Sequence, residues 1–165
     1  MLKIMIAVDG SPASLQAVRH GMRLVEEGLS AHFVIANVQK EASLLELVTQ
    51  DSDMIAAACV EAGTDLVAPA VALLAAAGIS HEVDISLGEP STALVDMAES
   101  HECEQILIGV TGLGETRSYW IGSVSREVAK LSSIPVTIVR TPEQALAEGG
   151  DEGDAQADEA ASSMD

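Results

Sequence analysis

Five short apolar runs alternate along the chain with segments whose apolar residues recur at helical spacing. Strands are expected at 2–8, 32–38, 81–87, 105–110 and 135–140, and helices after Pro12, over 54–77, after Pro90 and after Ser123. Such alternation favours a parallel sheet with right-handed crossovers and helices on both faces. The predicted fold class is therefore α/β, a single doubly wound parallel five-stranded sheet.

Two details qualify this pattern. Pro69 lies inside the second helical segment and is expected to kink or split it, because proline lacks the backbone N–H. The connection before that segment is expected to form a helical turn over 43–49.

Targeting signals are not evident in the sequence. No apolar run is expected to reach the length of about 20 residues that a membrane span needs, so we expect no direct membrane insertion. The first apolar run enters Asp9 without a cleavage site, which favours a strand over a signal peptide. Cys59 and Cys103 have no paired spacing and are expected to be reduced thiols of a cytoplasmic protein.

Charge divides the chain into two parts. The net charge of the whole chain is −18. Residues 142–165 contain eight acidic residues and no Lys or Arg, whereas the first 141 residues contain 18 acidic residues and eight basic ones. We expect a folded domain over 1–141 and a disordered acidic tail over 142–165. An acidic domain does not suit nucleic acid, which needs a basic patch. It would bind an anionic ligand through backbone N–H groups, a helix N-terminus or a metal ion.

The segment from Gly109 to Ser123 is the richest in functional signal. It begins at the end of the fourth expected strand and finishes at the start of the last expected helix. Glycines let a backbone turn sharply and approach a ligand, and a helix N-terminus favours phosphate. A surface loop with a glycine-capped helix fits the spacing equally well. The segment is neither a Walker A loop nor a dinucleotide fingerprint.

The spacing Gly109-x2-Gly112-x9-Gly122-Ser123 resembles the Gly-x2-Gly-x9-Gly-Ser/Thr signature of the ATP-binding branch of the universal stress protein family. Segments 6–11, 88–90 and 134–139 resemble that family's first strand and turn, its Gly-Asp/Glu-Pro helix entry and its final strand. The likeness covers 2–140. It implies the sheet order 3-2-1-4-5 and a homodimer paired through the last strand, with a tetramer as the alternative.

The resemblance also implies a set of nucleotide-binding residues. Asp9 would contact adenine or ribose, Val38 would meet the adenine, and the glycines would line the ribose and phosphates. Val110 stands where the family often has a polar residue, so Arg117 or Mg²⁺ would supply positive charge. The full predicted set is Ala7, Val8, Asp9, Val38, Gly109, Val110, Gly112, Gly122, Ser123, Val124 and Ser125. ATP is the expected ligand, with AMP or ADP as alternatives.

Three functions follow as hypotheses. The first is an ATP-binding regulatory stress-response protein that acts through nucleotide-dependent oligomerisation or through an unknown partner. The second is a nucleotide-free dimeric interaction protein, and the third is a slow ATPase. No catalytic residue is predicted, because Asp9 is the only nearby carboxylate and no arginine finger is evident. His101-Glu102-Cys103-Glu104 is expected to be a solvated turn, not a metal site.

Overall fold

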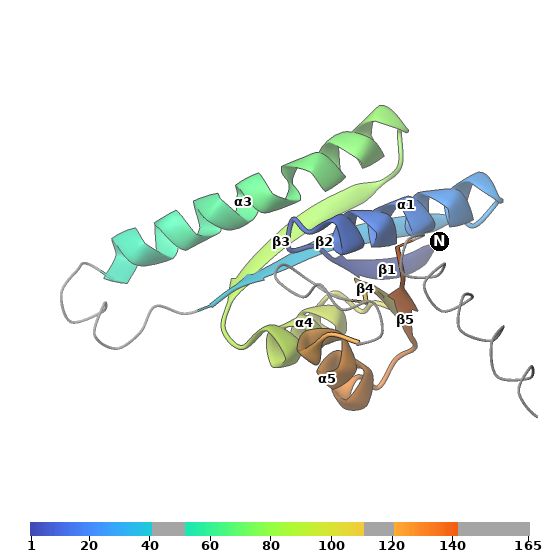
Figure 1. The fold of residues 1–165 in the computed structure, drawn as a ribbon. Coiled ribbons are helices and arrows are strands. Elements are labelled where there is room, and N and C mark those ends of the chain that lie inside the picture. The colour runs from blue at the N-terminus through green and yellow to red at the C-terminus, as the bar shows by residue number, and fades with distance from the viewer. Residues whose placement is uncertain (41–51, 111–120, 142–165) are drawn as a thin grey trace, which may run out of the picture.

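Five parallel strands form one sheet in the order β3-β2-β1-β4-β5 (Figure 1). The computed structural model describes residues 1–40, 52–110 and 121–141. The strands are β1 (Leu2–Ala7), β2 (Ala31–Gln39), β3 (His81–Leu87), β4 (Gln105–Gly109) and β5 (Val136–Val139). The predicted fold class and strand order are confirmed.

The central strand β1 shows why the strands are continuous apolar runs. It pairs with β2 on one side and β4 on the other, and Ile6 lies level with Ile35 and Leu107. Ile4 and Ile6 enter the core on one face, whereas Met5 and Ala7 enter the core on the other. A strand buried on both faces needs apolar residues at every position.

Helices cover both faces of the sheet (Figure 1). The helices α1 (Pro12–Glu26) and α3 (Ser52–Ala76) pack on the face that holds Ile4 and Ile6. The helices α4 (Pro90–Ser100) and α5 (Ser123–Leu131) pack on the opposite face. Both layers leave the carboxyl ends of the strands at one edge, where parallel sheets bind ligands.

Helix α3 corrects two expectations. It runs unbroken through Pro69 for 25 residues, so the proline does not split it. Its stretch Ala56–Ala76 is long and apolar enough, by length and composition, to cross a membrane, and only 22% of that stretch's most apolar window is buried. Glu61 and Asp65 interrupt the stretch, which is why no single apolar run is obvious in the sequence. Its carboxyl half packs on the sheet.

Two expectations concern residues outside the described part of the chain. These are the helical turn at 43–49 and the acidic tail over 142–165.

Candidate functional site

A cavity of about 190 Å³ lies at the carboxyl edge of the sheet, between β1 and β4. The strand order changes direction between these two strands, which is the point where doubly wound sheets bind ligands. The ends of β1, β2 and β4 and the first turns of α1, α4 and α5 contribute its walls. Seven of the predicted residues line it: Ala7, Val8, Asp9, Val38, Gly109, Val124 and Ser125.

The turn after β1 places Asp9 in the cavity wall. Gly10 adopts a φ of +80°, a left-handed conformation that favours glycine. The backbone N–H of Ser11 donates to Asp9 Oδ1 at 3.0 Å, and Ser11 Oγ caps α1 by accepting from Ser14 N at 3.1 Å. These bonds hold the half-buried Asp9 carboxylate at the edge of the sheet.

Gly109 is required by packing. A Cβ on this residue would lie 2.7 Å from the Ala13 carbonyl carbon, 2.8 Å from the Ala13 oxygen and 2.9 Å from Ser14 N. All three atoms belong to the backbone of α1, so they cannot move aside as a flexible side chain would. The glycine lets α1 lie directly on the end of β4, and this contact needs no bound ligand.

Hydrogen bonds join the end of β4 to the start of α5. Ser125 Oγ donates to the Gly109 carbonyl at 2.7 Å, and Gly122 N donates to the Val110 carbonyl at 2.6 Å. Val110 N in turn donates to Val139 O at 2.8 Å. The single hydroxyl proton of Ser125 is therefore already engaged, and this buried side chain clamps the helix to the sheet.

The other predicted residues are placed differently. Val110 is only 4% exposed, and its buried position explains why an apolar side chain stands there. Val110, Gly122 and Ser123 do not belong to the cavity lining. Gly112 and Arg117 lie outside the described residues.

The amino end of α5 has the electrostatics of an anion site. Gly122 caps this helix without a side-chain hydrogen bond, and its first turn holds no acidic residue. The first N–H groups of a helix have no partner within the helix, and its dipole places partial positive charge there. Val124, in that first turn, lines the cavity. An anionic group of a ligand in the cavity would meet this helix end.

Six lining residues were not predicted: Ser14, Ala36, Asn37, Pro90, Leu94 and Ile108. The buried Asn37 donates from Nδ2 to the Val8 carbonyl at 2.7 Å and accepts from Gln39. Asn37 is the residue before Val38, and Pro90 begins α4 just after the carboxyl end of β3, which the parallel order places at the same edge. Position next to a carboxyl end could therefore have identified both.

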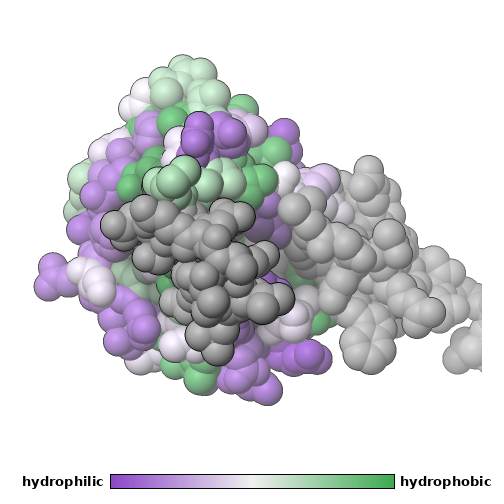
Figure 2. All heavy atoms as spheres, turned by 90° about the vertical axis from the view of Figure 1, so that its left-hand side faces the viewer, coloured by the Kyte–Doolittle hydropathy of each residue, from purple (hydrophilic) through white to green (hydrophobic). Residues whose placement is uncertain are grey.

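The surface around this edge is mixed in character. Figure 2 views the molecule from the side toward which the carboxyl ends of β2 and β3 point in Figure 1. The coloured atoms there alternate between hydrophilic and hydrophobic, without one continuous apolar face.

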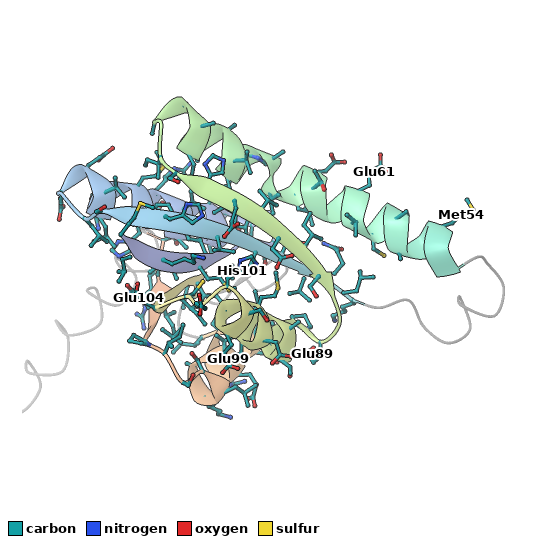
Figure 3. The ribbon with its side chains drawn as sticks, turned by 180° about the vertical axis from the view of Figure 1, so that it is seen from behind. Met54, Glu61, Glu89, Glu99, His101 and Glu104 are labelled. Carbon is teal, nitrogen blue, oxygen red and sulfur yellow. The ribbon has the colours of Figure 1, made fainter. Side chains whose placement is uncertain are left out.

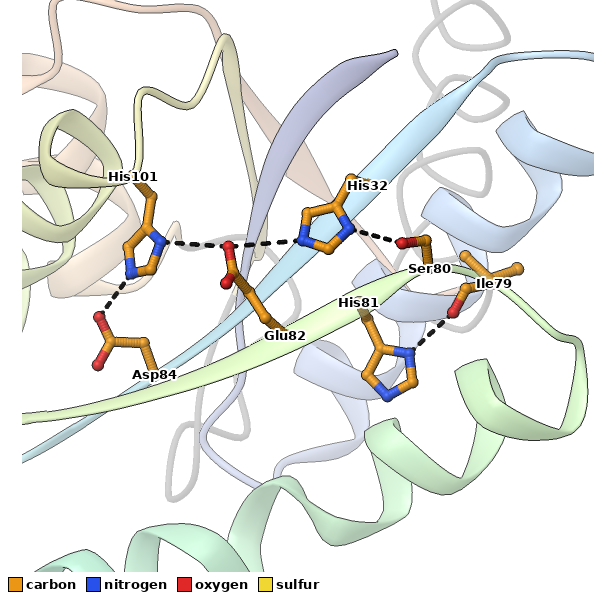
Figure 4. Close-up of polar contacts among 7 residues, drawn as sticks. All are labelled: His32, Ile79, Ser80, His81, Glu82, Asp84 and His101. Atoms are coloured by element: carbon orange, nitrogen blue, oxygen red, sulfur yellow. Dashed lines mark hydrogen bonds and ion pairs between the residues drawn. The ribbon is translucent and has the colours of Figure 1, made fainter.

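A second polar cluster lies away from the cavity, where β2, β3 and the end of α4 meet (Figure 4). His101 contacts Asp84 Oδ2 through Nε2 at 2.8 Å and Glu82 Oε1 through Nδ1 at 3.3 Å. His32 contacts the same Glu82 oxygen at 3.4 Å and bonds Ser80 at 2.7 Å. Within the described ranges, no three or more His, Cys, Asp or Glu side chains are grouped so that they could hold a metal ion.

The turn that contains His101 is not simply solvated, which corrects the expectation for this segment. Figure 3 shows His101 between the sheet and α4. Cys103 is 6% exposed, and its burial raises the pKa of the thiol to about 11. These contacts could not be predicted from local spacing, because Asp84 lies 17 residues before His101.

The fold defines a doubly wound α/β protein with a cavity at the switch in strand order. The chain belongs to the universal stress protein family, whose model matches residues 1–140. It is similar to universal stress protein YxiE of Bacillus subtilis, with 30% identity over 84% of this chain and 98% of YxiE. It is also similar to universal stress protein MJ0531 of Methanocaldococcus jannaschii, with 26% identity over 86% of this chain and 84% of MJ0531.

Solved structures share the fold. Hypothetical protein MJ0577 matches with a TM-score of 0.73 and 21% identity, over 85% of this chain and 96% of its own. A universal stress protein family protein from Arabidopsis thaliana with AMP bound matches with a TM-score of 0.60 and 18% identity, over 85% and 91%. A universal stress protein in complex with cAMP matches with a TM-score of 0.56 and 24% identity, over 84% and 95%.

Proposed function

We propose that the protein binds an adenine nucleotide in the cavity between β1 and β4 and acts as an ATP-binding regulatory stress-response protein. The observation that carries the proposal is that a largely apolar cavity, the Asp9 carboxylate and the amino end of α5, which has no side-chain cap, meet at the switch in strand order. The glycine spacing of the ATP-binding branch supports it. The AMP- and cAMP-bound structures of similar fold support an adenine nucleotide as the ligand class.

The cavity suits one part of a nucleotide. Its volume of about 190 Å³ is smaller than the pockets of about 300–1,000 Å³ that enclose whole drug-sized ligands. Val38 and Leu94 offer apolar walls to an adenine ring, and Asp9 offers a carboxylate to the ribose or the ring edge. Phosphates would then lie toward the first turn of α5.

Mg²⁺ fits this arrangement as a companion of the phosphates. Mg²⁺ in nucleotide sites is commonly held by one or two carboxylates together with phosphate oxygens. Among the described residues that line the cavity, Asp9 is the one carboxylate, and it is already assigned to the ribose or the ring edge. The ion would therefore be held by phosphate oxygens and water, and it would neutralise part of the phosphate charge.

The regulatory output is proposed to be a change of assembly or partner contact. β5 ends the sheet, and an edge strand offers backbone groups to another strand. We infer a homodimer paired through β5, with nucleotide shifting the oligomeric state. Sedimentation equilibrium with and without ATP tests this, and a monomer under both conditions would contradict it.

Titration calorimetry with ATP tests the binding site. Val38→Trp fills the cavity, so we expect affinity to fall by about tenfold or more. Val83→Trp is the matched control, because Val83 is 43% exposed on the neighbouring strand and lies outside the cavity. Gly109 makes a poor test, since any side chain there disturbs α1. Absence of ATP binding by the unmodified protein would favour the nucleotide-free alternative.

A further inference from the structure

A second cavity, of about 440 Å³, gathers much of the positive charge in this acidic protein. Arg19 and Arg23 of α1 line it with Arg140, beyond β5, and His20 adds an imidazole. The whole chain has eight Lys and Arg residues against 26 acids, so three of its eight permanent cations share one wall. Glu26 is the single carboxylate among the described residues of that wall. The cavity shares no lining residue with the one between β1 and β4.

The α1 side of this cavity is available to an anion. Arg19 and Arg23 lie one turn apart on the helix and are both exposed. Arg23 Nη2 lies 3.2 Å from His20 Nδ1, which leaves its other guanidinium donors to other partners. Neither arginine forms an ion pair with a residue of the ranges 1–40, 52–110 or 121–141. A planar guanidinium pairs well with carboxylates.

A segment of this chain has the matching charge and begins at the cavity. Thr141 is in the cavity wall, and residues 142–165 follow it with eight acids and no Lys or Arg. Glu143 comes two residues after the wall, which is about 7 Å of extended chain. A random-coil chain of 24 residues has a root-mean-square end-to-end distance of about 25–30 Å. Tethering of this kind gives effective concentrations of about millimolar.

We propose that the acidic segment 142–165 docks onto the basic surface of α1 formed by Arg19, His20 and Arg23. A separate polyanion must approach against the domain's own excess of acids, whereas the tethered segment is already held beside the cavity. The docked segment neutralises the arginines and covers the surface between α1 and β5. This inference does not depend on nucleotide binding.

Paramagnetic relaxation enhancement in the full chain tests the docking. A nitroxide label is attached at Ser162→Cys in a Cys59→Ser background, and the buried thiol of Cys103 stays unlabelled. We expect the label to broaden the amide signals of Arg19 and Arg23 more than those of α5. In about 0.5 M NaCl, where the Debye length falls to about 4 Å, the enhancement should drop by about fivefold or more.

Charge reversal supplies the specificity control. Arg19→Glu with Arg23→Glu should abolish the broadening on α1, whereas Arg126→Glu with Lys130→Glu, the same change on exposed residues of α5, should leave it unchanged. Amide shifts elsewhere in the sheet report that both double variants fold.

Three results would overturn the proposal. One is equal broadening over α1 and α5, and another is broadening that survives reversal of Arg19 and Arg23. The third comes from mixing ¹⁵N-labelled protein without nitroxide and spin-labelled protein without ¹⁵N. If this mixture reproduces the full broadening of α1, another copy's segment occupies the surface.

Discussion

Replacing Gly109 by alanine separates a packing role from a ligand-binding role for this glycine. The new Cβ would lie 2.7–2.9 Å from three backbone atoms of Ala13 and Ser14. Overpacking of this kind costs about 1–3 kcal/mol, and rigid neighbours favour the upper part of that range. Gly109 is not among the glycines with a left-handed φ, so alanine also gains about 0.4–1 kcal/mol from the unfolded chain. The net expected loss is about 1–2 kcal/mol.

Urea unfolding of the nucleotide-free protein, followed by far-UV circular dichroism, measures this loss. The midpoint should fall with an unchanged m-value, and the Tm should fall by about 2–8 °C for a chain of this size. Gly28→Ala is the matched control, because no atom lies within 4 Å of its added Cβ but its φ is +104°. The stability that Gly28→Ala loses, about 1–2 kcal/mol, measures the strain of a left-handed backbone conformation without any steric clash. If Gly109→Ala leaves stability unchanged or raises it, the packing argument is wrong.

Three further predictions concern the cluster beside β3. Native protein exposed to iodoacetamide at mildly alkaline pH should be alkylated at Cys59 far faster than at Cys103, as read by mass spectrometry, because Cys103 is buried and its pKa is raised to about 11. Because the folded protein raises the pKa of the Cys103 thiol from its ordinary value of 9.0, this thiol's contribution to stability is fully present below pH 9 and is lost as the pH rises toward 11. The free energy of unfolding should therefore decline from pH 9 to 11, and Cys103→Ala should reduce this decline. His101→Ala should lower the free energy of unfolding by about 0.5–1.5 kcal/mol, through its lost contacts with Asp84 and Glu82. Equal alkylation rates, or an unaffected His101→Ala variant, would contradict the packing of this cluster.

The fold was readable from the sequence because its signals are local. Short apolar strands and segments with helical periodicity alternate along the chain. This alternation predicts a parallel sheet without knowledge of the individual side-chain contacts. The split that was the second alternative at Pro69 does not occur: the proline removes one helical hydrogen bond, but Val67, Ala70 and Leu74 hold α3 against the sheet on both sides of that point. Tertiary packing outweighed the local preference.

The candidate site was readable only in part. Asp9 follows β1, Gly109 ends β4, and both belong to recognisable sequence patterns, so sequence alone placed them at the edge of the sheet. The cavity-lining roles of Asn37 and Leu94 depend on how deeply each side chain lies between elements, which spacing does not encode. The role of Gly109 in receiving the α1 backbone is equally tertiary.

Amide chemical-shift mapping of the full chain during titration with ATP and Mg²⁺ tests the central claim most directly. The account predicts that the largest shifts fall on Asp9, Val38 and Val124, which lie in the turn after β1, in β2 and in α5 around one cavity. Absence of shifts at saturating ATP would contradict nucleotide binding. Shifts confined to Arg19 and Arg23 would show that ATP binds only as an anion at the basic cavity, and the proposed site would be wrong.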